Sequence, residues 1–436
     1  MQTLPPFLIS PNQRWSALQK NIFRFFFIFL SATSLLAYNL FFMVMDTFFT
    51  ESHYTETHKL FSILSKPVQW IDHHLFNIGY NADTDIAAFG DVRFGWVMLP
   101  TIFFLSVGGA IVWAITGRKQ TNYNKLHYWF SSYLCIYIFV AMIHYSIQKI
   151  IPIQMPFPNI TSLLTPFGEK SKMALVWDFI GISPYYSMFT GLCELIGSLL
   201  LLHRRTRVFG ALFMMTVLTN VVCFNVFYNI GVKLLCMQLL VTNLFLLAPY
   251  IPKLFRFFYY LQPVSLTEKK YNFITPWKKY AVMALVLIPA WMGFITTKTA
   301  VEKNQKNIFN RKQQRQYDVR IFIKGKDTLP PLLTDSIRWR RFAISDYQGK
   351  RFAIIYNMQD EPDYYTYQAD STKKIITLTD NPDTTRKFYF SYKESYENKL
   401  LLRGIWKGQD VAMLLDNVDI DNIPVVKEKI TWIRKF

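Results

Sequence analysis

Residues 183–220 read SPYYSMFTGLCELIGSLLLLHRRTRVFGALFMMTVLTN, and this stretch decides the fold. Two apolar runs flank a short basic turn that contains Arg204, Arg205 and Arg207. A helix of about 20 apolar residues crosses the hydrocarbon core of a bilayer, and each run approaches this length. The stretch therefore predicts two membrane-spanning helices joined by a tight turn.

Further apolar runs extend this pattern over the region before residue 300. Because backbone groups in lipid must bond within their own segment, each run is expected to be an α-helix. The first run follows Arg14, Lys20 and Arg24 and is too long for a signal-peptide core, so we interpret it as a retained span. The predicted fold class is a membrane all-α helical bundle of about seven transmembrane helices, at 22–45, 96–116, 126–150, 184–203, 208–228, 232–248 and 278–297.

The positive charge of the chain is concentrated in this apolar region. The formal net charge is +19, yet residues 317–436 hold 20 Lys and Arg against 17 Asp and Glu. Cationic loops alternate with acidic loops between the predicted spans, and the positive-inside rule places the cationic set in the cytoplasm. The N-terminus is then cytoplasmic and the C-terminal domain extracytoplasmic. A nucleic-acid partner is not expected, since the part outside the bilayer has no basic surface.

The hydrophobic pattern changes after residue 298. Residues 299–316 are polar and basic and predict a linker between the membrane domain, 1–298, and the C-terminal domain, 317–436. From Tyr317 onward, apolar and polar residues alternate in about eight or nine short segments separated by turn signals. This pattern predicts an antiparallel β barrel or sandwich, for which a lipocalin-like meander is one arrangement.

The most informative polar residue is Glu194, near the middle of a predicted span. A charged carboxylate costs roughly 2.5–3.5 kcal/mol there even on the mildest insertion scale, so such residues usually face the bundle interior. Helical spacing puts Ser187, Thr190 and Ser198 on the same stripe, which a neighbouring helix can approach closely. A functional Glu194 would be a proton carrier, a cation ligand or a contact for a polar headgroup. A structural Glu194 would instead be protonated and donate a hydrogen bond to Asn220 on the next helix.

Other polar side chains share the outer half of the predicted bundle. If they converge with Glu194, they form a polar cavity that opens to the outside. Otherwise each is satisfied separately by backbone or water, and Lys233 extends to the outer interface. The ligand-binding candidates are Glu194, Thr190, Asn220, Asn225, His144 and Lys233.

Several types of site find no support in the sequence. The chain has four cysteines and no Cys-x-x-Cys pair, so neither a disulfide framework nor a thiol-redox motif is predicted. HExxH, Walker and GxSxG motifs are absent from the sequence. The adjacent His73 and His74 point in different directions on a helix, so they do not predict a metal site.

The helix FTGLCELIGSLLLL, the basic turn after it, and a following helix that opens with Gly210 and Ala211 resemble the DoxX-like family of small bacterial membrane proteins. The resemblance covers roughly residues 90–250 and implies a four-helix core with a site at Gly191, Glu194 and Asn220. Some relatives are linked to quinone-coupled oxidation of sulfur compounds or to redox-stress membrane complexes, which makes a quinone the candidate cofactor. This chain differs by its extra spans and its exported β domain.

Three functions fit these observations. The first is an accessory or binding protein of the bacterial inner membrane, whose core binds a lipid, a quinone-like molecule or a membrane partner while the β domain contacts periplasmic proteins. The second is a quinone-linked membrane oxidoreductase subunit that uses Glu194 as proton acceptor. The third is a small-solute transporter with Glu194 and Asn220 at mid-membrane, although no internal repeat is visible.

Overall fold

The chain divides into two compact units. Met1–Gln154 and Tyr185–Val301 form one, which we call the helical unit, and Met155–Pro184 and Glu302–Phe436 form the other, which we call the barrel unit. The sequence division, which ended the membrane domain at residue 298, did not include residues 155–184 with the β domain. The structure is a computed structural model, and it describes residues 14–37, 65–81, 91–264, 291, 293–306, 308, 314–347, 350–380, 385–395 and 399–428.

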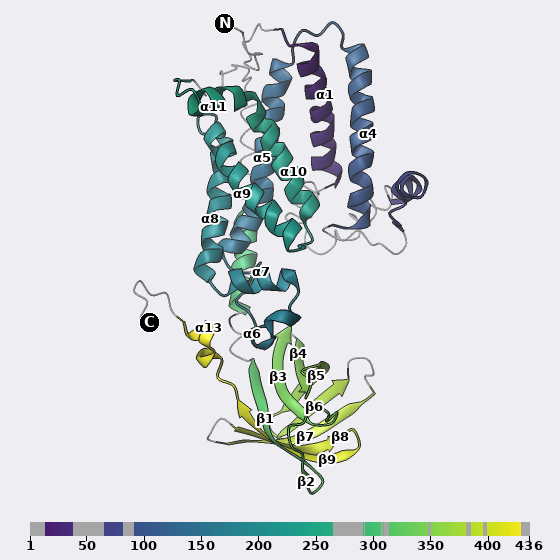
Figure 1. Cartoon of the computed structure of the whole chain (residues 1–436), viewed down its shortest axis with the longest axis vertical. Helices are drawn as coiled ribbons and strands as arrows, with labels where there is room; N and C mark the ends of the chain where they lie inside the picture. Colours follow the sequence, from purple (N-terminus) through teal and green to yellow (C-terminus); the bar gives the residue numbers. More distant parts are fainter. Residues whose placement is uncertain are drawn as a thin grey trace. The chain divides into compact units, whose positions relative to one another are not determined.

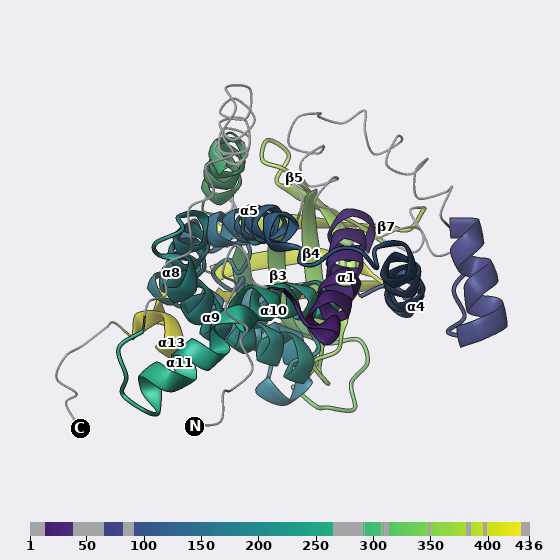
Figure 2. The ribbon, with the colours of Figure 1, turned by 90° about the horizontal axis from the view of Figure 1, so that it is seen from above.

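The helical unit is packed around α5 (Asn124–Ile150). In the most apolar stretch of α5, 67% of the residues are buried. In the corresponding stretch of α4 (Arg93–Thr116), 17% are buried. Leu134 and Ile138 of α5 are fully buried in a core shared with α9 and α10. Figures 1 and 2 show α8, α9 and α10 beside α5, with α1 between this group and α4. Other helices of the unit include α1 (Ala17–Ala32), η1 (Thr33–Ala37), η2 (Asp72–Phe76), α8 (Pro184–Leu202), α9 (Arg207–Phe227), α10 (Lys233–Leu247), η4 (Ala248–Tyr250) and α11 (Ile251–Phe258).

Five helical stretches in the described part of the chain are long and apolar enough to cross a membrane. They are α4, α5, α8, α9 and the continuous stretch Lys233–Phe258, and each overlaps a predicted span. Exposed side chains such as Phe103, Phe104 and Leu105 give α4 an apolar outer surface, as a lipid-facing helix requires. The helical unit therefore has the character of a membrane domain.

The first and last predicted spans are described only in part. The first, 22–45, begins inside α1 and continues through η1, and its residues 38–45 lie outside the described residues. Of the last, 278–297, residues 291 and 293–297 are described and are helical.

The barrel unit contains a closed, eight-stranded antiparallel β barrel. β1 pairs with β3, each strand from β3 to β8 pairs with the next in the chain, and β9 returns to pair with β1, which closes the sheet. A short strand, β2, extends β1 by a hairpin. The predicted β domain is confirmed, as a barrel and not a sandwich. The strands are β1 (Arg315–Lys324), β2 (Asp327–Thr328), β3 (Trp339–Tyr347), β4 (Lys350–Asn357), β5 (Pro362–Asp370), β6 (Ile375–Asp380), β7 (Lys387–Ser395), β8 (Lys399–Trp406) and β9 (Gln409–Asn417).

Aromatic side chains fill the middle of the barrel. Trp339, Phe342, Phe390 and Trp406 are all buried there, and the rings of Trp339 and Trp406 pack edge to face with centroids 5.0 Å apart. Because neighbouring positions on a strand point to opposite sides, a small barrel brings such side chains together inside. The barrel interior is a packed core and not a channel.

A segment before the second half of the helical unit packs against the barrel. The Ile160 backbone N–H donates to the Gln314 side chain at 3.2 Å, and Arg341 Nη1 donates to the Leu164 carbonyl at 3.4 Å. The segment contains α6 (Ile160–Leu164), η3 (Phe167–Glu169) and α7 (Lys172–Gly181), and the unit ends with η5 (Ile420–Asn422) and α13 (Pro424–Lys427).

Candidate functional site

Helices α5 and α8 cross at close range, and this crossing builds the first candidate site. The Ser187 hydroxyl donates to the Lys149 carbonyl at 2.9 Å. A Cβ on Gly191 would lie 2.7 Å from the Ser146 carbonyl oxygen, so only glycine fits between the helices. Ser187, Gly191, Glu194 and Ser198 are all buried on α8. The small polar stripe predicted on this helix thus includes the surface that faces α5, as small residues at a helix–helix contact allow.

Glu194 forms an ion pair with Lys149 at this crossing. Lys149 Nζ donates to Glu194 Oε1, and the two side chains are 12% and 4% exposed. The second carboxylate oxygen, Oε2, has no hydrogen-bond partner within the described residues. A buried pair keeps both charges only with good geometry and satisfied lone pairs. The site therefore offers one free acceptor oxygen beside an ammonium group.

The other predicted site residues do not gather around Glu194. Thr190 donates to the Ser187 carbonyl of its own helix at 2.8 Å. Asn220 is exposed. Asn225 is buried, and its Nδ2 donates to the Val221 carbonyl at 2.8 Å. The alternative in which Glu194 donates to Asn220 is wrong, because Lys149 on α5 is its partner.

His144 and Lys233 also have separate local partners. His144 hydrogen-bonds Gln148 one turn later on α5. Lys233 Nζ lies 3.2 Å from Asp91 Oδ2. Asp91 also accepts the backbone N–H of Lys233 and of Leu234, each at 3.0 Å, which caps the N-terminus of α10. Lys233 is thus part of a helix cap, and the six candidates do not form the single cavity that we considered.

Sequence reasoning missed Lys149, and it grouped Gln238 with the polar side chains of the outer half without predicting its partners. Lys149 lies in the last turn of α5, where a cation ordinarily extends to the interface. Gln238 is buried; its Oε1 accepts from the Tyr137 hydroxyl and its Nε2 donates to Thr33, both at 3.0 Å. Each contact joins helices that are distant in sequence, so no local signal marks it.

One end of the barrel holds a second candidate site. A cavity of about 330 Å³ is lined by side chains from seven of the eight barrel strands, including Arg315, Arg351 and Glu394. Burial, together with neighbouring Tyr317 and Tyr392, raises the pKa of Tyr367 in this cavity to about 12. Tyr367 is therefore neutral at physiological pH and acts as a hydrogen-bonding group.

Metal-ion chemistry has no visible site in the described part of the chain. No group of three or more His, Cys, Asp or Glu side chains is placed to hold an ion among these residues. All four cysteines lie in the described residues, and none of them forms a disulfide. The polar groups of the two candidate sites are cations, carboxylates and hydroxyls, a set suited to recognising polar ligands.

The chain is similar to the uncharacterized protein YwoB of Bacillus subtilis (strain 168), with 33% identity over 103 residues. The match covers 24% of the chain and 65% of YwoB, so the chain spans just under two thirds of that relative's length. No protein-family model matches the chain, and no solved structure matches it. Membership of the DoxX-like family therefore stays a prediction from the motif around Glu194.

Proposed function

We propose that this chain is a membrane-anchored binding protein whose helical unit receives the polar headgroup of a lipid or of a quinone-like molecule. The supporting observation is the buried Lys149–Glu194 pair with its unpartnered Oε2 among the described residues. Leaving a buried acceptor unpaired costs about 1–3 kcal/mol, which a hydroxyl or N–H donor on a ligand recovers. Lys149 is the more exposed of the two side chains, so the ligand approaches from its side.

The two charged groups suit such headgroups chemically. A quinone carbonyl or a lipid ester accepts a hydrogen bond from the Lys149 ammonium, and a hydroxyl donates to Glu194 Oε2. If the bound molecule is a quinol, this same oxygen is placed to accept its proton. That arrangement favours a quinone-linked oxidoreductase subunit as the second candidate function.

We also propose that the protein lies in the bacterial inner membrane with the barrel unit in the periplasm. The α4–α5 turn carries Arg118 and Lys119, and the α8–α9 turn carries Arg204 and Arg205. Cations at these turns favour a cytoplasmic position. A tag placed after Phe436 should be cut by protease in spheroplasts with intact membranes. A tag reached only after permeabilisation would contradict this orientation.

The binding proposal is tested by identifying what the purified protein carries. The full-length chain is extracted in a mild nonionic detergent, and the retained lipids and quinones are measured by mass spectrometry. We expect one species to fall at least tenfold in Glu194→Gln and to persist in Gly108→Ala, a change on α4 with no atom within 4 Å of the added Cβ. An identical profile in wild type and Glu194→Gln would overturn the proposal.

A further inference from the structure

The segment between β2 and β3 folds against the barrel and fixes the position of Arg338. The Leu329 N–H donates to the Phe322 carbonyl at 2.9 Å, which holds the start of the segment on β1. Near its end, Asp335 Oδ1 accepts the backbone N–H groups of Ile337 and Arg338 at 2.8 and 2.9 Å. This turn, in which an Asp side chain binds the backbone two and three residues on, sets the direction of the chain as it enters β3.

Arg338 is a buried cation whose hydrogen bonds are incomplete. Arg338 is only 4% exposed. Its Nη2 donates a hydrogen bond to the Val319 carbonyl at 3.1 Å. The paired residues of β1 and β3 end at Asp318 and Arg341, and β1 is irregular between Val319 and Ile321. The Val319 carbonyl therefore accepts a hydrogen bond from the Arg338 side chain. This bond uses one of the three guanidinium nitrogens.

The remaining nitrogens, Nε and Nη1, are buried and have no partner within the described residues. A guanidinium has five N–H donors and stays charged in proteins. Burial lowers the pKa of Arg338, and the nearby Asp335 carboxylate opposes this shift. Buried unsatisfied donors are rare in native proteins and call for an unseen partner. Since donors are unpartnered here, that partner is an acceptor, and the positive charge selects an anion.

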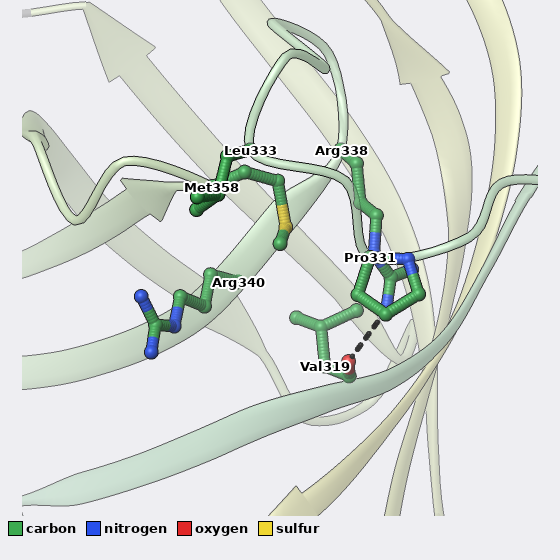
Figure 3. A pocket seen from close by; sticks show the side chains of 6 residues that line it. All are labelled: Val319, Pro331, Leu333, Arg338, Arg340 and Met358. Atoms are coloured by element: carbon green, nitrogen blue, oxygen red, sulfur yellow. Dashed lines mark hydrogen bonds between the residues drawn. The ribbon is translucent and has the colours of Figure 1, made fainter.

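A cavity of about 270 Å³ adjoins Arg338. Its other lining residues are Val319, Pro331, Leu333, Arg340 and Met358, so no acidic side chain is among the described residues that line it. Figure 3 shows Arg338 and Arg340 flanking the space, with the Arg338 bond to Val319 drawn as a dashed line.

Among these lining residues, the two arginines differ in their partners. Arg340 Nη1 already pairs with Asp360 Oδ2 at 2.5 Å. Arg338 is therefore the lining cation without a carboxylate partner among the described residues.

We propose that this cavity binds a carboxylate joined to a short apolar chain, with Arg338 as the anion-binding group. Charge-assisted bonds from a guanidinium to a carboxylate are among the strongest hydrogen bonds in proteins. The apolar part of the ligand packs against the walls formed by Val319, Leu333 and Met358. A phosphate would leave oxygens facing these walls without donors, which is unfavourable. The cavity holds roughly nine water-sized groups, so the ligand is small, of the size of hexanoate.

The ligand reaches Arg338 along the exposed part of the segment. Residues 330–334 are exposed, and Leu333 is 65% exposed although it lines the cavity. The apolar end of the ligand then buries part of Leu333, which removes an exposed hydrophobic side chain from water.

Titration calorimetry on the full-length chain in nanodiscs tests this site. Sodium hexanoate is the probe, with 1-hexanol and inorganic phosphate as comparisons and empty nanodiscs as the blank. We expect one hexanoate per chain, and at least tenfold weaker binding of hexanol and of phosphate. Arg338→Gln should weaken hexanoate binding at least tenfold. Arg320→Gln, at an exposed arginine of β1 that pairs with Asp416 of β9, should leave it unchanged.

Several results would overturn the proposal. They are absence of hexanoate binding, equal affinity of Arg338→Gln and wild type, or phosphate binding as tight as that of hexanoate. Leu333→Asp provides a second variant should Arg338→Gln fail to fold, because it changes an exposed position and adds a negative charge at the cavity. It should weaken hexanoate binding at least tenfold, and unchanged affinity in that variant would also reject the site.

Discussion

Lys149 in the helical unit and Arg338 in the barrel unit are both buried cations, but only Lys149 has a partner carboxylate. Lys149 meets Glu194 at the α5–α8 crossing. Arg338 reaches a backbone carbonyl with one nitrogen, while two nitrogens lack partners among the described residues. The comparison separates two uses of a buried charge. A cation paired within the chain fixes how helices pack and leaves only the second carboxylate oxygen of its partner for a ligand. A cation without its counter-charge points to a ligand that is itself an anion.

The largest effect is expected when the paired cation is removed. Lys149→Met leaves Glu194 buried without a counter-charge, and breaking such a pair costs about 3–5 kcal/mol. The free energy of unfolding, measured by reversible unfolding in mixed micelles, should fall by that amount.

Lys233→Met is the matched control for this loss. Lys233 also pairs with a carboxylate, but Asp91 keeps two backbone N–H bonds at 3.0 Å when the ammonium is removed. We expect a loss below about 1 kcal/mol, as for a partly exposed pair. If Lys149→Met and Lys233→Met lowered the free energy of unfolding equally, this would contradict the conclusion that buried Glu194 depends on Lys149 as its counter-charge.

The next largest effect concerns the glycine that lets α5 and α8 approach. An added Cβ in Gly191→Ala would lie 2.7 Å from the Ser146 carbonyl and 2.9 Å from the Ile150 nitrogen. Overpacking of this kind costs about 1–3 kcal/mol. Gly108→Ala on α4 meets nothing within 4 Å, so it should raise stability by about 0.5–1 kcal/mol through helix propensity. Opposite signs in the same unfolding assay are the predicted outcome.

A smaller effect is expected when the unpaired cation is removed. Arg338→Met deletes the bond to Val319 and also the two unsatisfied nitrogens. Replacing an incompletely bonded polar group by an apolar one of similar shape is close to neutral, so stability without added ligand should change by no more than about 1 kcal/mol. A loss as large as that of Lys149→Met would show that Arg338 already has a partner in the folded chain.

The smallest effect on stability at neutral pH is expected from Tyr367, which lines the cavity at the other end of the barrel. Burial raises the pKa of Tyr367 to about 12, above its ordinary value of 10.0. The folded chain holds this proton more tightly than the unfolded chain, so the resulting stability is complete below pH 10 and is lost as the pH rises toward 12. Thermal midpoints recorded across this range should fall less steeply in Tyr367→Phe than in wild type. Parallel curves would contradict the assignment.

Elements with a strong local pattern could be predicted from the sequence. Length and hydropathy located the five described spans, and strict alternation located the strands of the barrel. Closure of the sheet could not be predicted, because the pairing of β1 with β9 joins opposite ends of the domain. The packing of residues 155–184 on the barrel depends likewise on contacts between distant segments.

The candidate sites were less predictable than the fold. Glu194 was identified because a carboxylate inside an apolar span is costly. Its partner Lys149 was not, since pairing it requires knowing that α5 and α8 cross. Asn220 was expected to meet Glu194 from the next helix but is exposed, because lipid-facing and core-facing sides are equally apolar and give no helical periodicity. No feature of the sequence marked Arg338 as buried, because its burial depends on how the β2–β3 segment folds over it.

The measurement closest to the central claim is a double-mutant cycle on Lys149 and Glu194, using Lys149→Met, Glu194→Gln and the double variant. If the two side chains act as one buried unit, the double variant is more stable than Lys149→Met, and the coupling energy is about 1–3 kcal/mol. Losses that simply add would show that the two charges are independent, and the headgroup site built on them would then have no basis.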